Sequence, residues 1–162
     1  MRHFPNTLAL PRRACSHVIG LIAGKCVMKW SILYFDDDPV QLDIFREMFC
    51  HAYEVRTAAT LSEARRLISE TTFDIVISDL SMPEISGVDF LREAAQRNPS
   101  SVRVLVTGYA TAGKMLPEIS KGVVQFFLTK PWREQEMADV LDRAVAFLDI
   151  ESDELYTPGQ AG

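Results

Sequence analysis

Four charged residues of this sequence each follow a short, mainly apolar run. The residues and their runs are Asp36 and Asp37 after Ile32–Phe35, Asp79 after Ile75–Ser78, and Lys130 after Phe126–Thr129. In an open parallel sheet such runs are buried strands, and the carboxyl ends of the strands meet at one crevice where ligands bind. Three carboxylates and one ammonium at that crevice predict a site for a divalent cation and a phosphoryl group.

The adjacent acids Asp36 and Asp37 are the best candidates for metal ligands. On a regular strand their side chains point to opposite faces, but at a strand end both can bend toward the crevice. Mg²⁺ takes a few carboxylate oxygens, backbone carbonyls and retained waters, which suits this pair together with Asp79. The alternative is a solvated turn with a helix cap, and for Asp38, which precedes Pro39, the cap is the better interpretation.

The other candidates also have ordinary explanations. Asp79 can be a loop acid after a buried strand, Lys130 a surface charge, and Thr107 a β-branched residue at a strand end. Each signal is weak by itself. Their matched positions along one series of strands favour a common site.

The elements that must position these residues alternate along the chain. From Ser31 onward, strand-like runs alternate with helical patterns five times, which predicts an α/β domain with a parallel sheet covered by helices on both faces. The expected strands are Ser31–Phe35, Tyr53–Thr57, Phe73–Ser78, Val102–Val106 and Val123–Thr129. The helix expected between Ala110 and Ser120 is short, displaced or kinked, because it contains Gly113 and Pro117.

Length and composition predict one domain. The chain has 162 residues, 48% of them hydrophobic, which is enough for a single core. We expect an extension at 1–30, the domain at 31–149 and an acidic tail at 150–162. Residues 1–30 contain five Lys and Arg residues and no Asp or Glu. Residues 31–162 therefore contain 12 basic residues and all 22 acidic ones. A domain with such an excess of negative charge is a poor ligand for nucleic acid, because the phosphates of nucleic acid are also negatively charged.

The first 30 residues lack sustained periodicity. The favoured interpretation is an upstream extension, disordered or created by a start codon assigned too early, with Met28 as the working initiator. A targeting segment is the alternative, because Arg12-Arg13 precedes the apolar run Val18–Gly24. The three cysteines and three histidines show no disulfide or zinc spacing, and no run of 18 apolar residues occurs. A cytoplasmic protein with no membrane contact is therefore expected.

Several segments resemble the receiver domain of two-component response regulators, the CheY-like family. The segments are Ile32–Pro39, Asp74–Pro83, Gly87, Val104–Gly108 and Lys130-Pro131. The resemblance covers about Ser31 to Leu148. It implies a flavodoxin-like, doubly wound α/β fold, with a five-stranded parallel sheet in the order 2-1-3-4-5 and five helices.

The resemblance also implies a role for each site residue. Asp79 is the phosphoacceptor, Lys130 binds the phosphoryl group after a cis bond to Pro131, and Thr107 is the switch hydroxyl. The Mg²⁺ ligands are Asp37 directly, Asp36 largely through water, Asp79, and the backbone carbonyl of Ser81. The aromatic switch position is Phe127, where many members have Tyr, and Gly108 replaces a more usual small side chain.

The resemblance implies a stand-alone receiver that is phosphorylated by a histidine kinase or a histidine phosphotransfer protein and read by another protein. Such a chain is not an enzyme beyond its own phosphoryl transfer and autodephosphorylation. One alternative is an aspartate-nucleophile phosphatase of the haloacid-dehalogenase type, but those enzymes use a DxD motif and this chain has DDD at Asp36 to Asp38. The other is a degenerate receiver that acts only as a docking module.

Overall fold

The structure is a computed structural model that describes residues 19–22, 25–108 and 122–154, with side-chain burial for 29–108 and 122–150. None of the helices in this described part is long and apolar enough to cross a membrane. The helix predicted between Ala110 and Ser120 lies outside the described residues.

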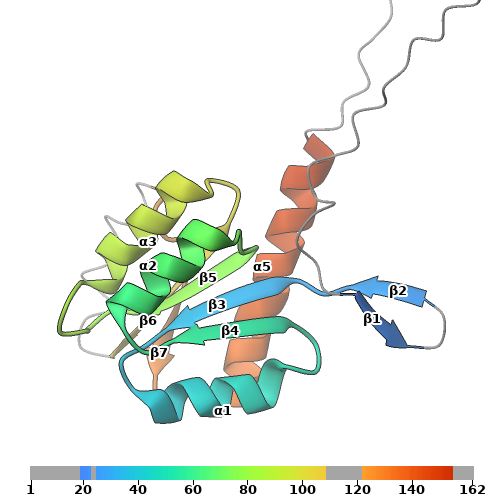
Figure 1. Ribbon diagram of the computed structural model, residues 1–162. Helices are drawn as coiled ribbons and strands as arrows, with labels where there is room; N and C mark the ends of the chain where they lie inside the picture. The colour runs from blue at the N-terminus through green and yellow to red at the C-terminus, as the bar shows by residue number, and fades with distance from the viewer. Residues whose placement is uncertain (1–18, 23–24, 109–121, 155–162) are drawn as a thin grey trace, which may run out of the picture.

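Five parallel strands form the central sheet (Figure 1). They are β3 (Ser31–Phe35), β4 (Glu54–Ala58), β5 (Ile75–Asp79), β6 (Val102–Gly108) and β7 (Phe126–Lys130). Their order across the sheet is β4-β3-β5-β6-β7, and every neighbouring pair is parallel. Numbered along the chain, this is the order 2-1-3-4-5, so the predicted topology is confirmed.

Four described helices cover the two faces of the sheet, with α2 and α3 on one face and α1 and α5 on the other (Figure 1). They are α1 (Pro39–Phe49), α2 (Leu61–Glu70), α3 (Gly87–Arg97) and α5 (Glu134–Glu154). The predicted doubly wound arrangement is therefore confirmed for these helices. Helix α5 continues to Glu154, beyond the predicted domain end at 149.

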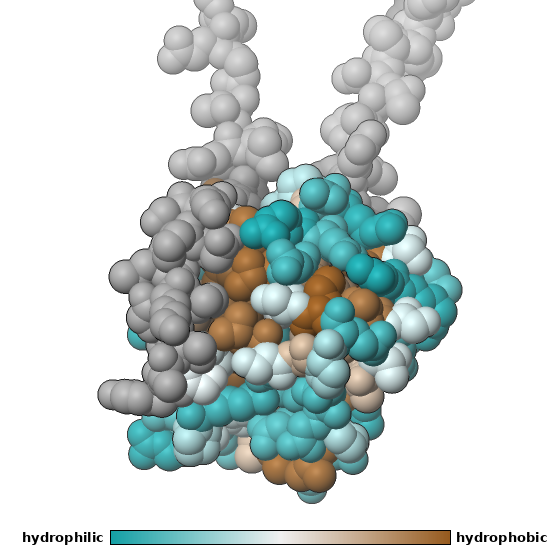
Figure 2. All heavy atoms as spheres, turned by 90° about the vertical axis from the view of Figure 1, so that its left-hand side faces the viewer, coloured by the Kyte–Doolittle hydropathy of each residue, from teal (hydrophilic) through white to brown (hydrophobic). Residues whose placement is uncertain are grey.

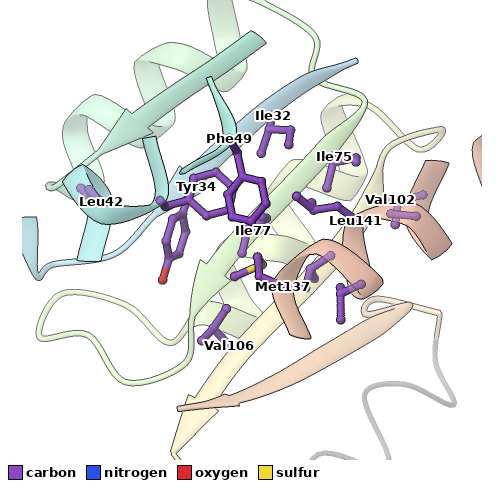
Figure 3. Close-up of a cluster of buried hydrophobic side chains, with 14 of the residues drawn as sticks. Ile32, Tyr34, Leu42, Phe49, Ile75, Ile77, Val102, Val106, Met137 and Leu141 are labelled. Carbon is purple, nitrogen blue, oxygen red and sulfur yellow. The ribbon is translucent and has the colours of Figure 1, made fainter. Parts of the chain in front are cut away.

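Alternation along the strands divides the core into two clusters. In β3, Ile32 and Tyr34 belong to the cluster that contains residues of α1 and α5, whereas Leu33 and Phe35 belong to the cluster under α2 and α3. This is the period-two pattern of a strand buried on both faces. Figure 3 shows the first cluster, and in it the hydroxyl of Tyr34 lies at the edge, pointing away from the other labelled side chains.

Side-chain caps begin α1 and α2, and the cap of α1 is the expected Asp38. The Asp38 carboxylate accepts a hydrogen bond from the Val40 N–H at 2.9 Å, and Pro39 occupies the first helical position. The Thr60 hydroxyl accepts one from the Glu63 N–H at 3.2 Å. Caps of this kind satisfy backbone N–H groups that have no partner within the helix. The chain therefore turns from β3 into α1 within three residues.

A two-stranded antiparallel hairpin precedes the sheet, made of β1 (Ile19–Ile22) and β2 (Lys25–Met28). The sequence did not predict it, because two four-residue strands are too short for periodicity to reveal. Strand β3, the first strand of the central sheet, begins at Ser31.

Candidate functional site

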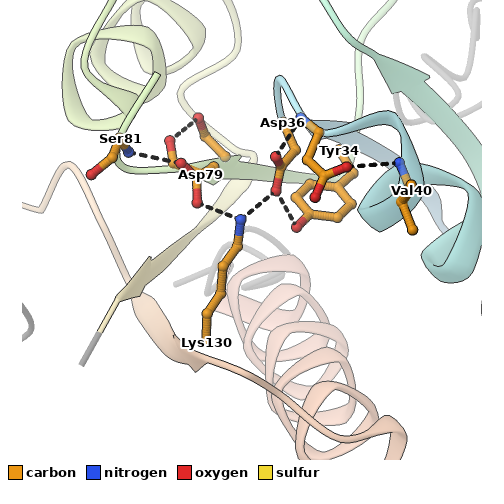
Figure 4. A network of polar contacts seen from close by, with 8 residues as sticks. Tyr34, Asp36, Val40, Asp79, Ser81 and Lys130 are labelled. Carbon is orange, nitrogen blue, oxygen red and sulfur yellow. Dashed lines mark hydrogen bonds and ion pairs between the residues drawn. The ribbon is translucent and has the colours of Figure 1, made fainter. Parts of the chain in front are cut away.

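The site lies at the carboxyl ends of the strands (Figure 4). Asp36 directly follows β3, Asp79 is the last residue of β5, and Lys130 is the last residue of β7. The Lys130 ammonium contacts both acids, with Nζ 2.7 Å from Asp36 Oδ2 and 2.7 Å from Asp79 Oδ1. Three residues that are far apart in the sequence thus form one charged group.

Asp36 is almost completely buried, with 1% of its surface exposed. Its Oδ1 accepts a hydrogen bond from the Asp38 N–H at 3.0 Å. Its Oδ2 accepts one from the Tyr34 hydroxyl at 2.9 Å, in addition to the contact with Lys130. A buried carboxylate needs such partners to remain charged.

Asp79 is 6% exposed, and its carboxylate is held by a backbone N–H group. Its Oδ2 accepts a hydrogen bond from the Ser81 N–H at 2.8 Å, which leaves Oδ1 for Lys130. The first residue of α3, Gly87, lies so close that a Cβ atom built there would be 2.0 Å from the Asp79 carbonyl oxygen. Only glycine allows α3 to begin against this strand end.

Lys130 reaches the acids from the end of β7, and its side chain is 27% exposed. The Lys130–Pro131 peptide bond is cis, as the sequence resemblance implied. Burial alone would lower the pKa of Lys130, but the hydrogen bonds and charges of Asp36 and Asp79 outweigh it, so the pKa is raised. The group stays an ammonium and neutralises one of the two carboxylates.

The same network affects Tyr34. Burial first, and then the charge of Asp36 and the hydrogen bond to it, raise the pKa of the Tyr34 phenol well above its usual range, although Trp132 opposes this rise. The phenol therefore remains protonated and acts as a hydrogen-bond donor. The sequence analysis missed this residue, because a tyrosine within an apolar run resembles a core residue. The available signal was its position two residues before Asp36, on the same side of a strand.

Thr107, Phe127, Asp37 and Ser81 are the other residues that the sequence predicted for the site. Thr107 is fully buried, pairs in register with Thr129, and its hydroxyl donates to the Gly108 carbonyl at 3.2 Å. Phe127 is 46% exposed. Asp37 is exposed, and Ser81 forms an isolated bridge with Ser86.

The structure brings together two of the three predicted carboxylates. Among the described residues, no group of three or more Asp, Glu, His or Cys side chains is arranged to hold a metal ion. Asp37 is exposed, whereas Asp36 and Asp79 are buried. Two buried carboxylates with one ammonium keep a net negative charge, and Lys130 occupies the place between them as a cation does. This donor set fits Mg²⁺, which binds through few carboxylates and keeps several waters.

A pocket of about 350 Å³ lies beside Lys130. Its lining residues are Gln41, Ile44, Met48, Lys130, Pro131 and Trp132. Figure 2 looks onto the edge where the strands end and shows hydrophobic surface in the middle of this face and again at the bottom, where α1 lies. On α1 the exposed apolar side chains are Val40, Ile44 and Met48, which are spaced four residues apart and so lie along one side of the helix.

Comparison with known proteins agrees with this geometry. Residues 32–142 match the response regulator receiver domain family. The hydrogenase transcriptional regulatory protein HoxA of Cupriavidus necator is 26% identical over 123 residues, which are 76% of this chain and 26% of that protein. The chain thus spans about a quarter of the length of this relative.

Two solved structures share both the fold and part of the sequence. One is a response regulator receiver domain protein from Clostridium thermocellum, with a TM-score of 0.67, 27% identity, and coverage of 79% of this chain and 99% of that one. The other is a CheY-like response regulator receiver domain protein from Methanospirillum hungatei, with a TM-score of 0.67, 27% identity, and coverage of 78% and 98%.

Proposed function

Because the chain belongs to the response regulator receiver domain family, we propose that it accepts a phosphoryl group on Asp79 in a histidine-to-aspartate phosphorelay, in a reaction that depends on Mg²⁺. The observation that carries this proposal is the contact of one ammonium, that of Lys130, with the two buried carboxylates of Asp36 and Asp79. Together these three side chains supply a nucleophilic carboxylate, negative charge that attracts a divalent cation, and an ammonium that can bind phosphoryl oxygens.

Asp79 supplies the nucleophile. One of its carboxylate oxygens attacks the phosphorus of a phosphohistidine in line with the P–N bond, so a P–O bond forms while the P–N bond breaks and the imidazole leaves with the electron pair. The Ser81 N–H holds Oδ2, and this contact directs Oδ1 toward Lys130. The acyl phosphate therefore forms on the side of Asp79 that faces the ammonium.

After the transfer, the Lys130 ammonium changes its partner. Its ammonium turns from the Asp79 carboxylate to the phosphoryl oxygens, where charge has increased. In this proposal Asp37, Asp79 and the Ser81 carbonyl would hold Mg²⁺ directly and Asp36 largely through water, and the ion would supply further positive charge to those oxygens. The chain is in this sense a catalyst only of its own phosphorylation and autodephosphorylation.

Thr107 and Phe127 form the switch in this proposal. The Thr107 hydroxyl, which now donates to the Gly108 carbonyl, turns to the phosphoryl group. Phe127, now half-exposed, then moves toward the space that Thr107 leaves. The change in surface is read by a downstream protein. Neither nucleic acid nor a membrane is a direct partner in this scheme, which takes place in the cytoplasm.

The phosphodonor is a histidine kinase or a histidine phosphotransfer protein. It must bring a phosphohistidine to Asp79 past Lys130, and the pocket lined by Ile44, Met48 and Trp132 lies beside that lysine. The exposed apolar side of α1 continues this surface. A partner helix with an apolar face that carries the phosphohistidine has the chemistry to bind there.

The test is the intact mass of the protein after incubation with acetyl phosphate and Mg²⁺. The parent should gain the mass of one phosphoryl group, and Asp79→Asn should keep the fold and gain none. Asp89→Asn, which changes an exposed acid of α3, is the matched control and should label like the parent.

Other outcomes identify the alternatives. Labelling of Asp79→Asn equal to that of the parent contradicts the acceptor assignment and favours the phosphatase-like chemistry of the first acidic motif. A parent that takes no label, with or without Mg²⁺, is instead a docking module.

A further inference from the structure

Tyr34 is a core residue with one polar atom, and that atom lies at the site. The side chain is fully buried, and its ring packs edge-on against Phe45 with a centroid distance of 5.0 Å. Its hydroxyl donates to Asp36 Oδ2 at 2.9 Å (Figures 3 and 4). A phenylalanine would supply the same packing, so the hydroxyl has no role in filling the core.

The strand itself fixes this contact. Residues two apart on a strand point to the same side, so Tyr34 and Asp36 project together from β3. The ring cannot turn away, because neighbouring core side chains surround it. The hydroxyl is therefore held in place relative to the carboxylate by the close packing of the core.

The three partners of Asp36 differ in how firmly they are held. The Asp38 N–H belongs to the backbone at the start of α1, and the Tyr34 hydroxyl belongs to the core. Lys130 alone has a long, partly exposed side chain, and it is shared with Asp79. When this lysine turns to a phosphoryl group, Asp36 loses its mobile partner and keeps the two fixed ones.

We propose that Tyr34 is a positioning residue of the cation site, whose hydroxyl holds Asp36 Oδ2 so that the carboxylate keeps its place when Lys130 leaves it. This inference rests on the proposed function, because it concerns the binding of Mg²⁺ beside Asp79. Hydrogen-bond partners of carboxylates at metal sites orient those carboxylates, and their loss typically weakens metal binding about 10- to 100-fold.

Titration of Mg²⁺ by calorimetry, without any phosphodonor, tests the inference. Tyr34→Phe should bind Mg²⁺ about tenfold more weakly than the parent and keep the near-ultraviolet circular dichroism of a folded chain. The matched control is Tyr53→Phe, which removes the hydroxyl of a half-buried tyrosine that packs on Phe49 in the same core cluster. This control should bind Mg²⁺ like the parent.

A double-mutant cycle separates positioning from a general loosening of the fold. In an Asp36→Ala background the hydroxyl has no carboxylate to hold, so the added Tyr34→Phe change should leave Mg²⁺ affinity as it is. If Asp36→Ala does not fold, Asp36→Asn takes its place, and the effect of Tyr34→Phe should then be smaller than in the parent. An equal loss of affinity in both backgrounds overturns the inference.

The outcomes also separate this inference from the proposed function. A parent that binds Mg²⁺ and takes the phosphoryl label, with a Tyr34→Phe variant of equal or higher affinity, overturns the role of Tyr34 alone. A parent that binds no Mg²⁺ overturns both proposals.

Discussion

Lys130 is the residue on which the charge balance of the site depends. Its ammonium contacts Asp36 and Asp79, which lie side by side and are nearly buried. Two buried carboxylates without a counter-charge repel each other and are poorly solvated. The raised pKa of Lys130 reflects the same attraction from the other side.

Lys130→Met should therefore destabilise the protein when no metal is present. Breaking a buried ion pair costs about 3–5 kcal/mol, and because Lys130 is 27% exposed we expect about 1–3 kcal/mol after allowance for solvent screening. Urea unfolding with and without Mg²⁺ measures the effect. Added Mg²⁺ should stabilise this variant more than the parent, because the ion no longer competes with an ammonium.

The control for this prediction is Lys29→Met, which removes a lysine whose ammonium contacts only the Cys50 carbonyl among the described residues. Its stability should stay close to that of the parent. Equal responses of Lys130→Met and the parent to Mg²⁺ would contradict the competition between ammonium and ion.

The sequence predicted that Asp36, Asp79 and Lys130 meet at the site, but it did not predict that Asp37 is exposed. The positions of Asp36, Asp79 and Lys130 after strands were enough, because parallel strands bring their carboxyl ends together. Asp37 and Asp36 have equal sequence signals, yet Asp36 is buried in the network and Asp37 is exposed. That difference arises in the turn after β3, which no periodicity describes.

At the scale of elements, α3 is placed by a glycine against the end of β5. Gly87→Ala should destabilise the protein by about 1–3 kcal/mol, because the new methyl group would meet the Asp79 carbonyl and push the helix away. The shift also moves the Asp79 backbone, so labelling by acetyl phosphate should slow. Thermal unfolding and the rate of mass gain measure the two effects.

Gly108→Ala is the matched control for stability, since a Cβ atom at Gly108 would meet no heavy atom of the described residues within 4 Å. It should change the unfolding temperature little. An equal loss of stability in both variants would mean that the close approach at Gly87 is not the cause.

A bidentate ion pair between Arg65 of α2 and Glu93 of α3 joins these two helices. Arg65 contacts Glu93 through Nε at 2.9 Å and Nη2 at 2.7 Å. The hydrogen bond from Arg65 lowers the pKa of Glu93 below its ordinary value of 4.5, and burial opposes this only in part. The pair is partly exposed, so we expect solvent screening to keep its contribution to stability small.

The pH dependence of this pair follows from the sign of the shift. A carboxyl with a lowered folded pKa contributes stability above its unfolded pKa and loses it as the pH falls through the folded value. Glu93→Gln should thus be less stable than the parent at pH 7, and the difference should vanish below the folded pKa of Glu93. Unfolding temperatures across this range measure it, with Glu70→Gln, which breaks a pair within α2, as the control.

The boundaries of the elements were predictable only where the apolar pattern or a cap marks them. Asp38 begins α1 as expected. Strand β7 begins three residues later than expected, at Phe126, because the Val123 carbonyl accepts a hydrogen bond from the buried Arg103 instead of joining the sheet. The end of α5 at Glu154 has no such mark, because its last turn is polar and shows no periodicity.

At the scale of the whole molecule, the topology was the most predictable property. Five strand runs with intervening helical patterns permit few right-handed arrangements, and the two core clusters show that both faces of the sheet are covered. The hairpin of β1 and β2 was not predictable in this way, because its strands are short and flank the domain.

The lysine between the acids has one more consequence, for the molecule without its ion. The chain carries its own counter-ion at the site, so folding does not require a metal to be inserted. Treatment with a chelator should leave the unfolding temperature of the parent within about 2 °C of that of the untreated protein, while abolishing labelling by acetyl phosphate. A large drop in the unfolding temperature would show that the ion is part of the scaffold.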